Sequence, residues 1–178
     1  MTLNFIQVEN DKYNPFLIEI FSEYLEWVLL MCEKEFNVIY NIKQLVKEAV
    51  ERSMEELDKY FPPEGRLIVC TDETRIVATV SMRKIGDKTA EIKRMYVQSL
   101  YRRKGIAKAL LKRLIEEAQY IGYSKLRLDS GPFMKEALNL YRFFGFTEIE
   151  PYAESEVLQE GIPKEISQNK IFMEMLLK

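Results

Sequence analysis

The fold of this chain is decided by the short stretch Arg102-Arg103-Lys104-Gly105-Ile106-Ala107. Ahead of it, the residues from Ala90 to Val97 mix apolar and polar side chains in alternation, which predicts a strand. Behind it, apolar residues recur at three- and four-residue spacing from Gly105 to Ile121, which predicts a helix with one buried face. Gly122 suits the left-handed position that ends a helix. The stretch is therefore the turn between a strand and a helix.

The alternation also assigns the side chains of the predicted strand to its two faces. Ile92, Arg94 and Tyr96 are expected on one face, and Glu91 and Lys93 on the other. Such a strand would be covered unequally on its two sides.

The turn has the properties of an anion cradle. The first N–H groups of a helix have no partner within the helix, and the helix dipole adds positive charge there. Gly105 lacks a Cβ and Ala107 is small, so a phosphate can approach the backbone closely. Arg102, Arg103 and Lys104 add full charges. The spacing does not match a P-loop, and the chain contains no Gly-x-Gly-x-x-Gly, which disfavours nucleotide hydrolysis and dinucleotide binding.

Three motifs in this order resemble the GNAT superfamily of N-acetyltransferases. The pattern Arg-x-x-Gly-x-Ala at 102–107 is similar to its acyl-CoA motif, Ala90-Glu91-Ile92 precedes it, and 140–146 resembles its Leu-Tyr-x-x-x-Gly-Phe signature. The likeness extends from about Arg66 to Pro151. It implies an α+β, α/β-like fold with a central mixed, mostly antiparallel twisted sheet. Helices would cover both faces, and a parallel pair of strands would splay apart at the acetyl-CoA site.

The resemblance implies an acyltransferase that moves an acetyl group from acetyl-CoA to a primary amine by direct attack in a ternary complex. Backbone groups of Met95, Tyr96 and Val97 would hold the pantetheine arm. The pyrophosphate would be held by the cradle and the first turn of its helix, namely Arg102, Arg103, Lys104, Gly105, Ile106, Ala107 and Lys108. Acetyl-CoA is the expected cosubstrate, and no metal is implied.

Three residues take catalytic roles by the same resemblance. Glu91 would accept the amine proton, unless a water relays it or Glu91 instead pairs with Lys93 or another cation. Tyr141 would protonate the leaving thiolate, although its hydroxyl could also be an anchor in the core. The backbone N–H of Met95 would stabilise the oxyanion. The chain has no histidine, which excludes triads and metal sites that need one.

Composition limits the remaining choices. A chain of 178 residues with 47% hydrophobic side chains can bury one core, so residues 1–178 are expected to form a single domain. The net charge of −2 argues against a general polyanion binder, and no nucleic-acid partner is expected. No apolar run is long enough to span a bilayer and no secretory leader is recognisable, so no membrane partner and a cytoplasmic location are expected.

Several questions stay open at this point. A noncatalytic acetyl-CoA-binding module that regulates a partner protein is the alternative function. The acceptor amine is not identified; the aromatic residues Phe21, Tyr24, Trp27 and Tyr40 either wall its pocket or belong to the core. The oligomeric state is also open, although many members of the family form dimers. Periodicity and turn residues predict these further elements: strands at 2–8, 67–70, 76–82, 125–129, 146–149 and 171–176, and helices at 15–35, 42–57 and 134–144.

Overall fold

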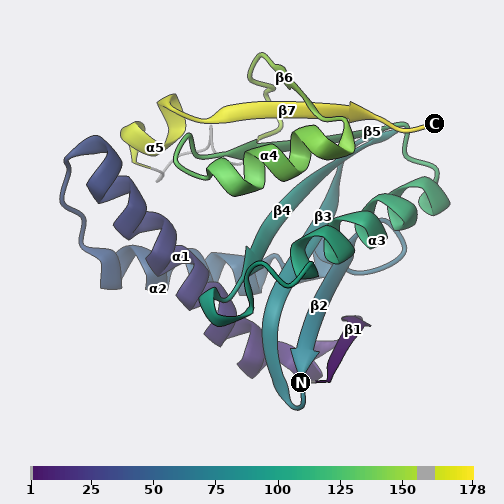
Figure 1. The fold of residues 1–178 in the computed structure, drawn as a ribbon, viewed down its shortest axis with the longest axis horizontal. Coiled ribbons are helices and arrows are strands. Elements are labelled where there is room, and N and C mark those ends of the chain that lie inside the picture. Colours follow the sequence, from purple (N-terminus) through teal and green to yellow (C-terminus); the bar gives the residue numbers. More distant parts are fainter. Residues whose placement is uncertain (1, 156–162) are drawn as a thin grey trace.

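A seven-stranded sheet runs through the computed structural model, which describes residues 2–155 and 163–178 (Figure 1). The strand order is β1-β2-β3-β4-β5-β7-β6. All neighbours are antiparallel except β4 and β5, which are parallel. The strands are β1 (Leu3–Gln7), β2 (Arg66–Asp72), β3 (Arg75–Gly86), β4 (Thr89–Val97), β5 (Lys125–Ser130), β6 (Thr147–Ile149) and β7 (Ile171–Leu176). The predicted mixed, mostly antiparallel sheet is confirmed.

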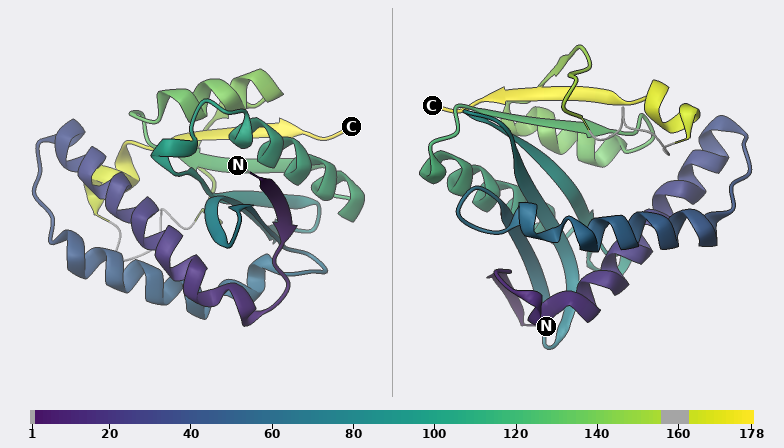
Figure 2. Two further views of the ribbon diagram at one scale, coloured as in Figure 1. Left: turned by 60° about the horizontal axis from the view of Figure 1, so that its bottom comes forward. Right: turned by 180° about the vertical axis from the view of Figure 1, so that it is seen from behind.

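Helices cover both faces of this sheet (Figure 2). They are α1 (Asn14–Phe36), α2 (Ile42–Glu55), α3 (Ile106–Ile121), α4 (Lys135–Phe144) and the short α5 (Lys164–Gln168). Alternate residues of β2 show the division: Ile68 packs in the cluster that contains the apolar faces of α3 and α4, and Leu67 packs in the cluster of α1 and α2. The described helices include none with the length and apolar character needed to cross a membrane.

The predicted elements are all present, with shifts at their ends, and two features differ from the expectation. Helix α5 is not predicted by the sequence pattern. The pattern also gives the last strand no neighbours, whereas β7 lies between β5 and β6. Residues Lys125–Ser130 pair with β7 along their whole length. The short strand β6 therefore forms the edge of the sheet.

A β-bulge interrupts β4 near its end. Ser81 of β3 lies opposite Lys93 and Thr79 lies opposite Tyr96, so Arg94 and Met95 together occupy the place of one residue. Arg94 adopts a left-handed φ of 52°. The bulge reverses the alternation: Tyr96 packs with the α1 and α2 cluster, away from the cluster of α3.

The predicted division of faces is therefore wrong beyond the bulge. Ile92 lies in the α3 cluster, as a regular strand would place it. Arg94 does not follow it there, because its guanidinium carbon lies 4.3 Å from the centre of the Tyr60 ring, which belongs to the opposite face. The alternation could not reveal this, since one inserted residue shifts every later side chain.

The parallel strands separate just before the bulge. Their last paired residues are Glu91 and Arg127, yet β4 continues to Val97 and β5 continues to Ser130. Figure 1 shows the two strands diverging. The predicted splayed pair is confirmed, and the wedge between its two ends is the natural place for a ligand.

Gly65 provides a test of the packing around β2. A Cβ at this position would lie 2.6 Å from the Cα of Tyr60 and closer still to the carbonyl oxygen of Lys59, and backbone atoms cannot easily move away. We expect Gly65→Ala to lower the free energy of unfolding by about 1–3 kcal/mol, the usual cost of overpacking. Urea denaturation measures this change.

Gly86→Ala is the matched control. Its new Cβ would lie 3.7 Å from the Cβ of Thr89, an ordinary contact. This variant should stay within about 0.5 kcal/mol of the wild type. Equal stability of the two variants would show that the contact at Gly65 relaxes without cost.

Candidate active site

The cradle predicted from the sequence has the geometry of an anion site. Helix α3 begins at Ile106, and its N-cap is Gly105 with a left-handed φ of 80°. No side chain caps this end. A Cβ added at Gly105 would meet no atom of the protein within 4 Å. The first N–H groups of α3 therefore face open space of the kind that a diphosphate can fill.

The basic residues of the cradle have different surroundings. Arg102 turns back: its Nε donates to the carbonyl oxygen of Val97 at 3.0 Å, and its guanidinium lies over the ring of Trp27. Lys108 extends from α3 over the ring of Phe143, which belongs to α4 and is 67% exposed. Arg102 is thus held against α1, and Lys108 lies beside an exposed aromatic surface.

The predicted pantetheine residues lie at the end of β4. Among the described residues, β5 pairs with none of β4 beyond Glu91. The backbone edge of β4 that faces the wedge is therefore unpaired at Met95, Tyr96 and Val97. The hydroxyl of Tyr96 donates to Glu23 of α1 at 2.9 Å, which fixes the end of the strand against that helix. Met95, at the bulge, lies outside the regular ladder with β3 as well.

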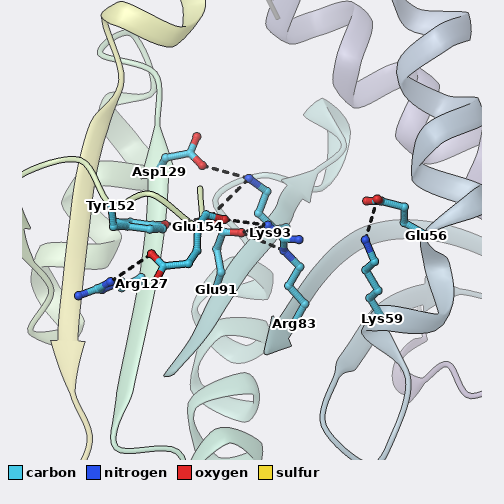
Figure 3. Close-up of polar contacts among 9 residues, drawn as sticks. All are labelled: Glu56, Lys59, Arg83, Glu91, Lys93, Arg127, Asp129, Tyr152 and Glu154. Atoms are coloured by element: carbon cyan, nitrogen blue, oxygen red, sulfur yellow. Dashed lines mark hydrogen bonds and ion pairs between the residues drawn. The ribbon is translucent and has the colours of Figure 1, made fainter. Parts of the chain in front are cut away.

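Glu91 is fully buried and engaged by three neighbours (Figure 3). Its Oε2 accepts from Nε and Nη2 of Arg83 at 3.0 and 2.9 Å, and its Oε1 accepts from the hydroxyl of Tyr152 at 2.9 Å. The ammonium group of Lys93 lies 3.9 Å from Oε1. The ion pair considered as an alternative is therefore present, with Arg83 as the nearer cation. The predicted role of Glu91 as a base is not decided by this geometry.

Tyr141 lies on the buried face of α4 and is 5% exposed. Its ring meets Phe146 edge to face, at 5.8 Å between ring centres. Its hydroxyl makes no hydrogen bond to any residue in the described part of the chain. Burial raises the pKa of Tyr141, and the nearby Tyr24 phenol and Asp129 carboxylate raise it further. The hydroxyl therefore stays protonated at neutral pH and can donate a proton.

A second set of polar side chains, centred on Asp129, links the two strands across the wedge, and the sequence did not predict it. Asp129, near the end of β5, accepts from Lys93 of β4 at 3.0 Å and from Lys170 at 2.6 Å. Burial alone would raise the pKa of Asp129, but the two ammonium groups outweigh burial and hold it well below its usual range. The only signal in the sequence was an acid at the carboxyl end of a strand that runs parallel to β4.

A cavity of about 220 Å³ opens at this point, between α1, α2, the splayed strands and the segment 163–170. Its polar lining consists of Glu48, Arg52, Ser53, Glu56, Lys93, Arg94, Asp129 and Lys170. Of the four aromatic residues considered for an acceptor pocket, only Tyr24 lines it. Phe21 is a core residue, which is the alternative expected for these aromatic side chains. A larger hollow of about 670 Å³ between α1 and α2 is lined by no predicted site residue.

Tyr141 is near the cavity, because its phenol interacts electrostatically with Tyr24 and Asp129, which both line the cavity. Met95 follows the lining residue Arg94 in the chain, and its side chain packs against the α3 cluster. The cradle follows the carboxyl end of β4, the same end that β5 leaves open. In residues 2–155 and 163–178, no group of three or more His, Cys, Asp or Glu side chains is arranged to hold a metal ion.

Comparison with known proteins agrees with this arrangement. The uncharacterized N-acetyltransferase YsnE of Bacillus subtilis is 32% identical over 100 residues, which cover 55% of this chain and 66% of that protein. The matched regions span from 37% to 66% of the lengths of three such curated relatives.

Solved structures share the fold. An acetyltransferase of the GNAT family from Staphylococcus aureus Mu50 has a TM-score of 0.70 at 23% identity, with 99% of this chain and 100% of that one covered. The PaiA N-acetyltransferase of Thermoplasma acidophilum, solved in complex with coenzyme A, has a TM-score of 0.70 at 16% identity and 99% coverage of both chains.

The family model of the acetyltransferase (GNAT) family matches residues 18–146, which include the cradle, the splayed strands and the Tyr141 motif. This match confirms the predicted superfamily and the predicted class of domain, an acyltransferase. The chain belongs to the acetyltransferase (GNAT) family.

Proposed function

We propose that the protein is an N-acetyltransferase that transfers an acetyl group from acetyl-CoA directly to a primary amine. One observation carries this proposal: the wedge between β4 and β5 connects an open helix N-terminus to a polar cavity that Tyr141 approaches. A ligand lying along β4 from Gly105 to the bulge would bring its far end to that cavity. The coenzyme A complex of a protein with the same fold supports the choice of ligand.

The chain offers suitable groups to each part of acetyl-CoA. The free N–H groups at the start of α3 and the basic residues around Gly105 would bind the diphosphate. The open edge of Met95, Tyr96 and Val97 would hydrogen-bond the pantetheine amides, as a strand edge does. When bound, acetyl-CoA supplies a thioester whose carbonyl carbon is open to attack by an amine.

The reaction then needs three groups from the protein. The amine nitrogen forms a bond to the carbonyl carbon, the carbon–sulfur bond breaks, and the products are an amide and the coenzyme A thiol. The backbone N–H of Met95 would stabilise the carbonyl oxygen as its charge grows. Tyr141 would give its proton to the departing thiolate. A base must take the proton of the amine, whose usual pKa is about 10.4 for a lysine-like group.

For this base we propose Glu91 acting through water. Its carboxylate is buried and its two oxygens already accept hydrogen bonds from Arg83 and Tyr152, which leaves little room for direct contact with an amine. Lys93, which lines the cavity, has its ammonium group 3.9 Å from Oε1 of Glu91, and Glu91 itself is not a lining residue. A water in the cavity would take the proton first and pass it on.

Titration with acetyl-CoA followed by a coenzyme A release assay over a panel of primary amines tests the function as a whole. Binding with turnover of at least one amine supports it. Binding with no turnover would favour the alternative, a noncatalytic acetyl-CoA-binding module. Absence of binding would contradict both. The cytoplasmic location, a homodimer and the absence of a nucleic-acid partner stay predictions.

We expect Gly105→Ala to weaken acetyl-CoA binding by about tenfold or more, because the methyl group would enter the space of the diphosphate. Isothermal calorimetry measures the affinity. Gly122→Ala is the matched control: Gly122 ends the same helix with a similar φ of 93°, and its Cβ would meet only the flexible end of Lys88 at 3.8 Å. Both changes should cost about 1–2 kcal/mol of stability from the left-handed backbone, but only the first should affect binding. Equal affinities in the two variants would remove Gly105 from the cofactor site.

Tyr141→Phe should lower kcat by about 100-fold or more, the usual contribution of a general acid, and leave acetyl-CoA affinity nearly unchanged. Steady-state kinetics and calorimetry separate the two effects. Because the pKa of Tyr141 is raised, its protonated form should persist across the alkaline range, so its own titration should not limit kcat below about pH 10.

Tyr123→Phe is the control for Tyr141. Tyr123 is also buried, but its hydroxyl donates to the carbonyl oxygen of Glu64 at 2.9 Å, far from the wedge. This variant should lose about 1 kcal/mol of stability and keep its kcat. If Tyr141→Phe instead lost stability and kept its turnover, the hydroxyl would be an anchor in the core.

A double variant separates the two roles of Glu91. Glu91→Gln alone removes the buried carboxylate to which Arg83 and Tyr152 donate, and should cost about 3–5 kcal/mol of stability. Replacing both partners, as Arg83→Met with Glu91→Leu, should recover most of that loss. We expect its kcat to stay low by about 100-fold, since the base is still missing. Full recovery of both stability and kcat would show that the carboxylate serves only the ion pair.

A further inference from the structure

Among the described residues that line the cavity at the wedge, four are basic (Arg52, Lys93, Arg94 and Lys170) and three are acidic (Glu48, Glu56 and Asp129). Asp129 is paired with both Lys93 and Lys170. Glu56 is paired with Lys59, at 2.7 Å.

The two arginines of the cavity have no carboxylate partner in the described residues. Arg52 is exposed on α2, at the rim. Arg94 lies deeper, on β4. Glu48, an exposed acid one turn before Arg52, accepts a hydrogen bond from the Gln44 amide. Among the described residues, Arg94 is therefore the cation inside the cavity that has no carboxylate partner.

The guanidinium of Arg94 is held in place by aromatic rings. Its central carbon lies 4.3 Å from the centre of the Tyr60 ring and 5.3 Å from that of Phe21, and both rings are buried. Contacts of this kind stabilise an arginine without using its N–H groups. The Nη1 atom is itself buried, and no described residue accepts a hydrogen bond from it. A buried donor without a partner is costly, so its N–H groups are available for an acceptor from outside.

The β-bulge explains how this donor comes to the cavity. A regular strand would place Arg94 on the face of α3, away from α1 and α2. The left-handed φ of 52° turns it to the same side as Lys93, so two successive cations line one cavity. A strained backbone at a non-glycine residue is a feature that surrounding structure must stabilise, and such residues concentrate at ligand sites.

We propose that the acceptor amine carries a carboxylate, and that Arg94 binds this group inside the cavity while Arg52 attracts it at the rim. The proposal rests on the proposed transfer to an amine and names its substrate class, a small amino acid rather than a polyamine. A guanidinium matches a carboxylate with two parallel hydrogen bonds. The volume of about 220 Å³ suits a small molecule. A polyamine would bring more positive charge to a cavity that already has an excess of it.

Binding of an amine-free probe tests the site without any need for turnover. Glutarate and its uncharged diamide, glutaramide, are compared by saturation-transfer NMR on the intact protein. We expect a signal for glutarate only, reduced by about tenfold in Arg94→Met. Lys112→Met is the matched control: it removes an exposed cation of α3 whose nearest acid is Glu116, and should leave the signal unchanged.

Two further samples keep the binding test decisive. Arg52→Met changes an exposed position and should not disturb folding. It should weaken the glutarate signal, and it keeps the test decisive if Arg94→Met proves unstable. Inorganic phosphate separates a carboxylate site from a general oxyanion site. Equal signals for glutarate and glutaramide, an unchanged signal in both arginine variants, or binding of phosphate with no binding of glutarate would overturn the proposal.

Kinetics then connect the site to the reaction. Each primary amine is assayed as the free acid and as its carboxamide, beginning with β-alanine and β-alaninamide, and the ratio of the two kcat/KM values is taken. In Arg94→Met this ratio should fall by about tenfold or more, and in Lys112→Met it should not change; the ratio cancels differences in amine reactivity. An unchanged ratio in Arg94→Met contradicts the inference alone. Absence of turnover with every amine contradicts the proposed function, and the glutarate measurement still decides whether the cavity binds carboxylates.

Discussion

The β-bulge in β4 sets the direction of every side chain that follows it. Arg94 and Met95 share one position opposite β3, so Tyr96 faces α1 and Val97 faces α3, the reverse of a regular strand. The same insertion takes the backbone of Met95 out of the ladder. Because β5 has already separated from β4 at Glu91, the end of β4 has one edge open to a ligand. The proposed cofactor site and the proposed acceptor cavity therefore depend on a single irregularity.

An opening between two strands has to be stabilised, because buried backbone N–H and C=O groups without hydrogen bonds lower the stability of the fold. The polar contacts at the splay meet this need. Glu91, the last paired residue of β4, is tied to Arg83 of β3 and to Tyr152, and Lys93 joins β4 to Asp129 of β5 just beyond. Burial of such groups is tolerated only when nearly all their hydrogen bonds are made. The network thus fixes the angle at which the strands part, whichever proton-transfer role Glu91 has.

The sequence was sufficient where the chemistry is carried by the backbone. A glycine with room for a diphosphate and a periodic helix after it are local patterns, and the structure places Gly105 at a left-handed N-cap as those patterns require. The order of the strands up to β5 follows from turns and from a helical crossover. The bulge was not predictable, because no residue type marks the insertion of one position: Arg94 is an unusual choice for a left-handed φ.

The acceptor side was not predictable for a different reason. The lining of the cavity comes from α1, α2, β4, β5 and the segment near Lys170, so residues distant in the chain meet only after folding. Asp129 carried no pattern of its own, and its importance appears only with Lys93 and Lys170 around it. Under the proposed function, these tertiary neighbours select the amine. Among them is Arg94, whose guanidinium the bulge turns into the cavity and whose Nη1 donates to no described residue.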